Sequence, residues 1–220
     1  MGTKELNSRR CLILGGGTIE NYAAVRKQVK RGDFILCADS GYLHCKRLGL
    51  NPDLLLGDFD SLGRTPVGLA CIAHPAEKNY TDSTLAVREA IKRGYTHLLM
   101  AGMLGRRLDH TWGNLQNLAW CAGNGIDAKI TDGETDVFAV KDGEITIPPR
   151  ENAYFSVFSI SGISKGVTIS GGKYPLTEYD LSFDDPRAVS NEFDGKDVRV
   201  AVKRGIVAII TTPRGREEDG

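Results

Sequence analysis

Residues 54–61 are Leu54-Leu55-Leu56-Gly57-Asp58-Phe59-Asp60-Ser61, an apolar run that ends in a glycine and two aspartates. Side chains alternate between the two faces of an extended strand, so Asp58 and Asp60 are expected to point the same way. Two bare carboxylates about 6 Å apart repel each other by roughly 3 kcal/mol at an effective dielectric constant of about 20. A bound cation would relieve that repulsion. The stretch therefore predicts a strand that brings two carboxylates to a ligand site.

Short apolar runs recur along the first part of the chain, and helical patterns separate them. The expected strands are residues 11–14, 34–38, 54–56, 71–73, 97–101 and 128–130. The expected helices are residues 21–30, 43–48, a segment from Thr81 and Asp82 to a stop at Gly94, and 111–121. This alternation predicts an α/β fold with a mostly parallel sheet and helices on both faces. Ligands of such sheets bind beyond the carboxyl ends of the strands.

The pattern changes near residue 140, where short strands and turns replace the helices. The expected strands are residues 144–147, 154–160, 166–169, 198–202 and 206–211, with a hairpin turn at Lys203-Arg204-Gly205. A small antiparallel β-sandwich or partial barrel fits this pattern. We therefore expect an α/β domain over residues 1–140, a β-sandwich domain over 141–213 and a disordered charged tail over 214–220.

Composition excludes several classes of function. The 220 residues include 28 Lys and Arg and 28 Asp and Glu, which argues against a broad surface for nucleic acid or anionic membrane. No apolar stretch approaches membrane-spanning length, and the polar first ten residues do not resemble a signal peptide. The five cysteines have no metal-like spacing, and Cys11, Cys37 and Cys71 are expected to be buried thiols. A cytoplasmic location is the expectation.

Oxygen ligands for Mg²⁺ are the first chemical hypothesis. Mg²⁺ is commonly held by one or two carboxylates together with substrate phosphates, and Asp58, Asp60 and Asp82 are the candidates. Lys78 would then place a compact positive charge on a phosphate oxygen. The alternatives are a solvated turn at Asp58 and Asp60, a helix cap at Asp82 and an ordinary surface lysine at Lys78.

Two glycine-containing segments are candidate anion sites. Residues 102–110 follow an expected strand, where glycines such as Gly105 let backbone N–H groups approach an anion and Arg107 offers a planar fork. The alternative is a basic surface loop with Asp109 as a cap. Residues 15–17 are three glycines without the spacing of a P-loop or the full dinucleotide fingerprint. They indicate a tight turn that could receive a phosphate or a base.

Two further segments are weaker candidates. Asp39 precedes Ser40 and Gly41 after an expected strand, and alone it is ambiguous. Ser190 and Asn191 lie in the β region, where their polar groups could contact a heterocycle while Phe193 offers an aromatic face. A polar turn between strands is the alternative for this second segment.

In combination these segments resemble the thiamine pyrophosphokinase family. The matching pieces follow the family's order over most of the chain: Ala38-Asp39-Ser40-Gly41, Pro52-Asp53, Gly57-Asp58-Phe59-Asp60-Ser61, Lys78, Thr81-Asp82, Gly105, Arg107-Leu108-Asp109-His110 and Ser190-Asn191-Glu192-Phe193. The resemblance implies a homodimer that transfers the diphosphate of ATP to the hydroxyl of thiamine and releases AMP. It also implies that thiamine binds between the catalytic rim of one subunit and the β domain of its partner.

The resemblance also implies roles for individual residues. Mg²⁺ would be held by Asp58, Asp60 and Asp82; catalysis would use these three with Lys78, Arg107 and Asp109; ATP would contact Gly16, Gly17, Asp39, Gly105 and Arg107; and thiamine would contact Asp82, Asp109, Ser190 and Asn191. The chain departs from the family's pattern at two positions. Many relatives have an acidic residue where Asn79 stands and a second glycine where Arg106 stands.

Two other functions remain as alternatives at this point. A phosphatase with an aspartate nucleophile also places Asp-x-Asp after an apolar strand, but Leu62 follows Ser61 here and residues 107–110 would have no role. A sensor that binds thiamine or nucleotide without turnover would keep the pocket, although binding alone does not demand three carboxylates.

Overall fold

The computed structural model describes residues 9–57, 69–73, 79–105 and 107–215. The chain divides into two compact units, the first formed by residues up to 121 and 125–133, the second by residues 122–124 and from 134 onward. Asp58, Asp60, Lys78 and Arg106 lie outside the described residues, and so does most of the expected tail. The separate catalytic and thiamine-binding roles expected for residues 1–140 and 141–213 stay a prediction.

The first unit is built on a parallel sheet, as predicted. Its strands are β1 (Arg10–Leu14), β2 (Phe34–Ala38), β3 (Leu54–Gly57), β4 (Cys71–Ala73), β5 (His97–Ala101) and β6 (Asp127–Thr131), in the order β6-β5-β1-β2-β3-β4. Every pairing among them is parallel. The strand β1 lies between β2 and β5, so the chain changes direction across the sheet there. Such a switch point is where open α/β sheets bind ligands.

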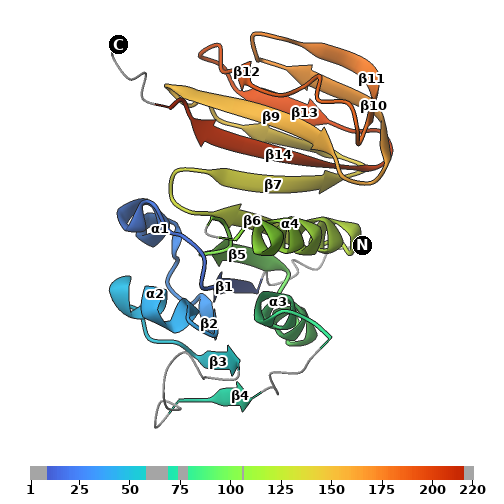
Figure 1. The fold of residues 1–220 in the computed structure, drawn as a ribbon. Helices are drawn as coiled ribbons and strands as arrows, with labels where there is room; N and C mark the ends of the chain where they lie inside the picture. Colours follow the sequence, from blue (N-terminus) through green and yellow to red (C-terminus); the bar gives the residue numbers. More distant parts are fainter. Residues whose placement is uncertain (1–8, 58–68, 74–78, 106, 216–220) are drawn as a thin grey trace, which may run out of the picture. The chain divides into compact units, whose positions relative to one another are not determined.

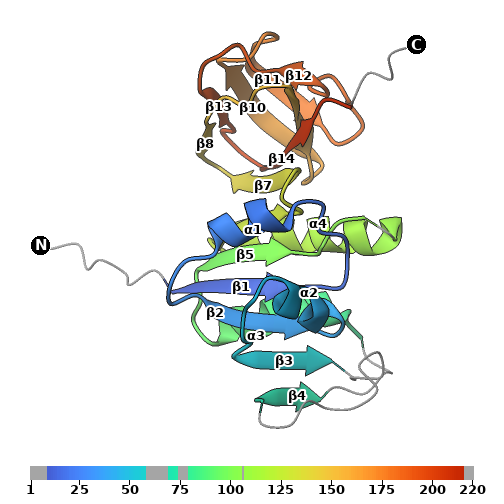
Figure 2. The same ribbon diagram turned by 90° about the vertical axis from the view of Figure 1, so that its left-hand side faces the viewer.

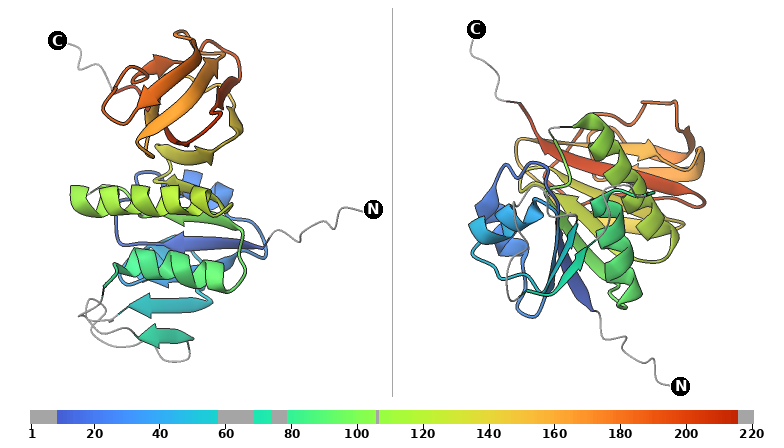
Figure 3. Two further views of the ribbon diagram at one scale, coloured as in Figure 1. Left: turned by 90° about the vertical axis from the view of Figure 1, so that its right-hand side faces the viewer. Right: turned by 60° about the horizontal axis from the view of Figure 1, so that its bottom comes forward.

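Within the described ranges, four helices cover this sheet, two on each face. Figure 2 shows α1 (Tyr22–Gln28) and α2 (Gly41–Arg47) in front of the strands, and Figure 3 shows α3 (Asp82–Lys92) and α4 (Leu108–Gly123) over the opposite face. The core between strands and helices is apolar, and α3 contributes Ala86, Val87 and Ala90 to it. Helix α4 begins three residues before the expected start, because residues 108–110 already form its first turn.

The second unit consists of two antiparallel sheets, visible in Figure 1. Its strands are β7 (Asp136–Lys141), β8 (Glu144–Ile147), β9 (Ala153–Ser159), β10 (Ile163–Ser170), β11 (Leu176–Ser182), β12 (Asn191–Glu192), β13 (Val198–Ala201) and β14 (Ile206–Pro213). One sheet has the order β12-β9-β14-β7 and the other β11-β10-β13-β8. Side chains alternate along β9 between buried and half-buried, and both sheets contribute valines and isoleucines to one core. This arrangement confirms the predicted β-sandwich.

The expected hairpin at Lys203-Arg204-Gly205 is wrong. Strand β13 pairs with β8 and β10, whereas β14 pairs with β7 and β9. Residues 203–205 therefore carry the chain from one sheet to the other. The Gly205 N–H donates to the Asp142 side chain at 2.7 Å, so the turn is held by a segment distant in sequence.

Among the described residues, no helix combines the length and the apolar character needed to cross a membrane.

Candidate active site

A pocket of about 350 Å³ opens at the carboxyl edge of the parallel sheet. It is formed by the segments that follow β1, β2 and β5 and by the first turns of α3 and α4. Its lining residues are Gly15, Gly16, Gly17, Ala38, Asp39, Ser40, Thr81, Asp82, Ser83, Gly102, Met103, Gly105, Arg107, His110 and Asn114. The volume lies in the range of about 300–1,000 Å³ that small-molecule sites occupy.

Backbone contacts fix the glycine segment 15–17 against the loop after β5. The Gly17 N–H donates to the Gly102 carbonyl at 2.7 Å, and the Thr18 N–H donates to the Leu104 carbonyl at 2.7 Å. A Cβ atom on Gly17 would lie 2.5 Å from the Leu104 carbonyl oxygen, closer than real Cβ atoms approach. Only glycine fits there. Because the Gly17 N–H already donates to the Gly102 carbonyl, it is not free to bind an anion. Gly17 instead lines the pocket as closely packed backbone.

His44 of α2 supports the same segment from outside the pocket lining. Its Nε2 lies 2.9 Å from the Gly17 carbonyl oxygen, and its Nδ1 lies 2.6 Å from the Tyr22 hydroxyl. A carbonyl can only accept, so Nε2 carries the ring proton and Nδ1 accepts from Tyr22. Sequence reasoning did not single out His44, because its partners come from other segments of the chain.

Asp39 lies where β2 and β3 end side by side. Its backbone has φ 47°, in the left-handed region that aspartate tolerates better than most residues. Its N–H donates to the Leu56 carbonyl at 2.8 Å, and a Cβ atom on Gly57 would lie 3.2 Å from the Asp39 Cα. The last described residue of β3, Gly57, is therefore adjacent to a pocket-lining aspartate. The predicted ligands Asp58 and Asp60 follow it in sequence, outside the described residues.

Asp82 is the first residue of α3 and lines the pocket. The alternative role of helix cap belongs instead to Thr81, whose hydroxyl accepts from the Thr84 N–H at 3.2 Å. A carboxylate in the first turn of a helix is stabilised by the positive end of the helix dipole. The negative charge of Asp82 is therefore tolerated at the start of α3, although Asp82 does not cap the helix.

Arg107 and Asp109 form an ion pair at the start of α4. The Arg107 Nε lies 3.1 Å from Asp109 Oδ1, and its Nη2 lies 2.5 Å from Oδ2. This hydrogen bond raises the pKa of Arg107 and lowers the pKa of Asp109. Arg107 lines the pocket with His110, whereas Asp109 is not among the lining residues. The carboxylate therefore orients the guanidinium, whose remaining edge can meet an anion.

Gly105 also lines the pocket and adopts φ +76°, a conformation that favours glycine. A Cβ atom there would lie 2.5 Å from Thr18 Oγ1. The turn thus keeps the loop after β5 close to the segment after β1.

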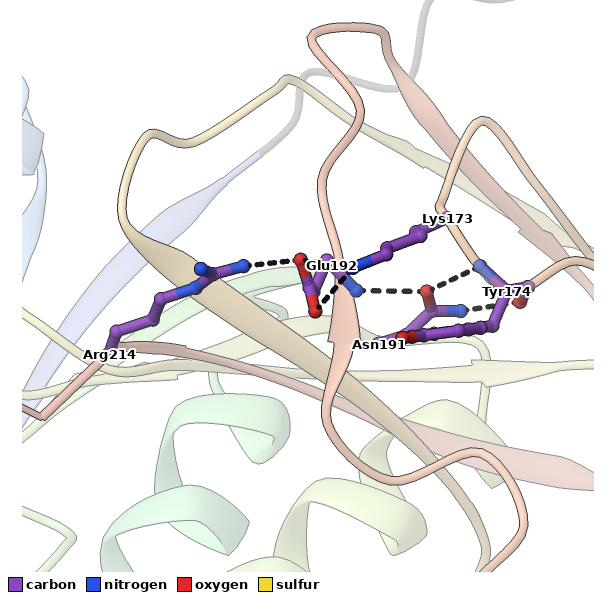
Figure 4. Close-up of polar contacts among 5 residues, drawn as sticks. All are labelled: Lys173, Tyr174, Asn191, Glu192 and Arg214. Atoms are coloured by element: carbon purple, nitrogen blue, oxygen red, sulfur yellow. Dashed lines mark hydrogen bonds and ion pairs between the residues drawn. The ribbon is translucent and has the colours of Figure 1, made fainter.

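Ser190 and Asn191 belong to the second unit. Asn191 is 3% exposed, and Figure 4 shows its amide clamped to backbone: Oδ1 accepts from the Tyr174 N–H at 3.0 Å and the Glu192 N–H at 2.9 Å, and Nδ2 donates to the Tyr174 carbonyl at 2.6 Å. Ser190 has φ 57°, and its N–H donates to Ser156 Oγ. Phe193 packs on Phe155 with ring centroids 5.1 Å apart.

Six of the predicted site residues line one pocket, namely Gly16, Gly17, Asp39, Asp82, Gly105 and Arg107. Asp109 lies beside it through its pairing with Arg107, and Ser190 and Asn191 lie in the other unit. Within the described ranges no three His, Cys, Asp or Glu side chains gather as a metal site would require. The predicted metal triad is not tested, because Asp58 and Asp60 lie outside those ranges.

Several lining residues were not predicted. Ser40, Thr81 and His110 stand beside predicted residues, so sequence neighbourhood could have suggested them. Asn114 lies in the second turn of α4 and carried no local signal. Its role depends on the loop that packs against it.

Comparison with known proteins identifies the family. The family model described as thiamin pyrophosphokinase, catalytic domain, matches residues 25–130, and the one for the vitamin B1 binding domain of the same enzyme matches residues 143–207. The thiamine pyrophosphokinase of Bacillus subtilis is 28% identical over 179 residues, which cover 78% of this chain and 84% of that protein.

Solved structures agree with these matches. The thiamin pyrophosphokinase of Geobacillus thermodenitrificans superposes with a TM-score of 0.80 at 26% identity, over 94% of this chain and 98% of that one. The Bacillus subtilis structure gives a TM-score of 0.83 at 23% identity, over 93% of this chain and 99% of that one, and supports the fold. The chain belongs to the thiamin pyrophosphokinase family, a family of transferases, as its motifs predict.

Proposed function

We propose that this chain transfers the terminal diphosphate of ATP to the hydroxyl of thiamine, giving thiamine diphosphate and AMP. The thiamine oxygen forms a bond to the β-phosphorus, and the bond between that phosphorus and the oxygen bridging to the α-phosphorus breaks. The proposal rests on one pocket at the switch point of the sheet, which is lined by Asp39, Asp82 and Arg107. The chain that forms this pocket belongs to the thiamin pyrophosphokinase family.

Two aspartates in the lining of this pocket support a Mg²⁺ site. They are Asp39 and Asp82, and β3 ends beside Asp39 directly before Asp58 in sequence. Asp58, Asp60 and Asp82 are the residues proposed to hold the ion. When bound, Mg²⁺ would neutralise charge on the phosphate oxygens and so favour transfer.

The side chains of this protein bind and orient the reactants. Transfer of this kind depends on positioning and on neutralising charge more than on covalent catalysis. Arg107, which pairs with Asp109, is proposed to bind phosphate oxygens, and Lys78 is proposed to add a second cation. The glycine segment 15–17, which lines the pocket, is proposed to contact the nucleotide through its backbone. One of the rim aspartates is proposed to accept the proton of the thiamine hydroxyl.

Thiamine is proposed to bind with help from a second subunit. Ser190 and Asn191 belong to the unit matched by the vitamin B1 binding model, which supports a role in holding the pyrimidine ring. The proposal of a homodimer is based on the resemblance to the family. Asp82 and Asp109 are proposed to meet thiamine from the catalytic side.

A coupled assay for AMP release tests the activity. Purified chain is incubated with ATP and Mg²⁺, and thiamine is compared with other small primary alcohols. We expect AMP release only with thiamine or a close analogue. Tight binding of both substrates without AMP would support a sensor, and phosphate release with a covalent phosphate trapped on Asp58 would support the phosphatase.

A further inference from the structure

We propose that Asn117 is a positioning residue for this reaction, which acts on Asp82 through Thr84 and Thr81. The inference deepens the proposed function, since the residue that it positions is a proposed metal and thiamine ligand. Asn117 itself is not among the residues that line the pocket.

Asn117 lies in the middle of α4, where asparagine is a poor helix former. Its side chain is 8% exposed, and its Oδ1 accepts a hydrogen bond from Thr84 Oγ1 at 3.1 Å. Because the half-buried Thr84 belongs to α3, this bond joins the two helices. The contact lies at the end of α3 that borders the pocket.

The hydrogen bonds continue from Thr84 to the cap of α3. Thr84 Oγ1 lies 2.9 Å from Thr81 Oγ1, and the Thr84 N–H donates to the same Thr81 oxygen at 3.2 Å. Thr81 also lies 3.1 Å from Ser83 Oγ. Asp82 stands between these residues in sequence, so the position of its backbone depends on this network.

The neighbouring turn of α4 makes a similar contact with the loop after β5. Asn114 is 7% exposed, and its Nδ2 donates to the Met103 carbonyl at 2.8 Å in the loop after β5. Residues 114 and 117 share one face of the helix because they are three apart. One face of α4 thus bonds to both segments that carry predicted charged groups, the start of α3 and the loop before Arg107.

Stability alone does not account for an asparagine at position 117. Its Nδ2 is buried and finds no hydrogen-bond partner within the described part of the chain. A buried donor without a partner is costly, and a leucine, which branches at the same carbon, would avoid that cost. The amide is therefore better explained by what its oxygen holds than by its own contribution to the core.

The test compares Asn117→Leu, Thr84→Val and the double variant with the natural chain. Each single change removes the hydrogen bond between Thr84 and Asn117, and Thr84→Val also removes the contact between Thr84 Oγ1 and Thr81 Oγ1. Gln116→Leu is the matched control, because Gln116 is an exposed amide on the same helix. If Asn117→Leu does not fold, Thr84→Val still tests the hydrogen bond, because it leaves the sequence of α4 unchanged.

Two readouts are needed, and one does not depend on turnover. Hydrogen exchange should show the amides of Thr84 and Leu85 in α3 exchanging about tenfold faster in each variant. The melting temperature should be unchanged or raised in Asn117→Leu and lowered in Thr84→Val, which leaves the buried Asn117 Oδ1 without its donor. At saturating ATP, Mg²⁺ and thiamine, kcat should fall about tenfold or more, because small displacements of positioned groups are costly. The double variant should be no worse than Thr84→Val, because the bond that Asn117→Leu removes is already absent there.

Unchanged exchange and kcat in Asn117→Leu or Thr84→Val, or additive losses in the double variant, would overturn the proposal. If the natural chain shows no turnover, the proposed function fails. The exchange measurement still decides whether Asn117 fixes the start of α3.

Discussion

Asp82 begins α3, and Thr81 before it forms the cap. From the sequence alone, cap and ligand were both possible for this aspartate, because aspartate is common in either position. The hydroxyl of Thr81 accepts a hydrogen bond from the Thr84 N–H, so Thr81, and not Asp82, caps α3. The charge of Asp82 faces a pocket instead.

Replacing Asp82 by asparagine should therefore separate activity from stability. We expect Asp82→Asn to lower kcat at least about a hundredfold, since it removes a charge from the proposed metal site. The lost interaction with the helix dipole should cost only about 0.3–1 kcal/mol of unfolding free energy. Steady-state kinetics and thermal unfolding measure the two effects.

Asp194→Asn is the control for that change. Asp194 is exposed in the second unit and pairs with Lys196, so its loss should alter neither quantity appreciably. Near-normal turnover in Asp82→Asn would remove Asp82 from the proposed site.

The burial of the cysteines was predicted only in part from the sequence. Burial was predicted for Cys11, Cys37 and Cys71, and the first two are fully buried, whereas Cys71 on the outer strand β4 is half-buried. Burial also raises the pKa of Cys121 to about 12. Apolar neighbours in the sequence predict a strand. The position of that strand in the sheet, central or outer, decides how deeply its side chains are buried.

At the scale of elements, apolar runs located the parallel strands well. Strands β2, β4 and β5 have the predicted bounds, because a buried strand must be apolar along its length. Strand β11 was missed, since its sequence LTEYDLS is largely polar and only Leu181 is fully buried. Strand β12 has two residues and no pattern to detect. Pairing partners of β13 and β14 are set by distant segments, which explains the wrong hairpin.

The glycine segment after β1 gives a prediction about backbone contact. Gly17→Ala should destabilise the fold by about 1–3 kcal/mol and weaken ATP binding, because its Cβ would collide with two carbonyl oxygens of the loop after β5. Gly113→Ala should instead stabilise the protein by about 0.5–1 kcal/mol, since Gly113 lies within α4 with open space around it.

Urea unfolding and nucleotide titration measure both variants. Equal stability of the two alanine variants would show that the loops do not hold Gly17 as closely as described.

A cluster in the second unit links β12 to the end of β14, and it gives a pH prediction. The Glu192 carboxylate accepts from Lys173 Nζ at 3.1 Å and from Arg214 Nη2 at 2.6 Å (Figure 4), and these contacts lower its pKa below the ordinary value of 4.5. A lowered pKa adds stability above the unfolded value, and this gain is lost as the pH falls through the folded value.

Glu192→Gln should accordingly lower the melting temperature slightly at pH 7, and the difference from the natural chain should vanish on acidification below pH 4.5. The size of the effect should be small, because the cluster is at the surface. Melting curves between pH 7 and pH 3 test this, and a difference that persists at the acid end would contradict the assignment.

At the scale of the whole molecule, the sequence predicted the class of fold and the family, but not the assembly of the pocket. The motifs named residues one segment at a time, and the glycines, Asp39 and Arg107 meet because β1, β2 and β5 are adjacent. His44, Asn114 and Asn117 carry no local signal, since each acts on a segment that only folding brings near it.

The proposed dimer predicts that subunits share a site. Asp82→Asn and Ser190→Ala variants should each be weakly active, and mixing them after dissociation should restore about a quarter of the natural activity. That fraction follows because about half of the dimers would be mixed, with one of their two sites intact. No recovery in a mixture shown to contain mixed dimers would place both residues in sites formed by one subunit.

The proposed reaction transfers a diphosphate group from ATP to thiamine. Phosphorus NMR of a mixture of the protein, ATP, Mg²⁺ and thiamine is a direct test, because it identifies every phosphorylated product. We expect the two coupled resonances of thiamine diphosphate, appearing in equal amount with AMP. Thiamine monophosphate with ADP, or free phosphate with no phosphorylated thiamine, would contradict it.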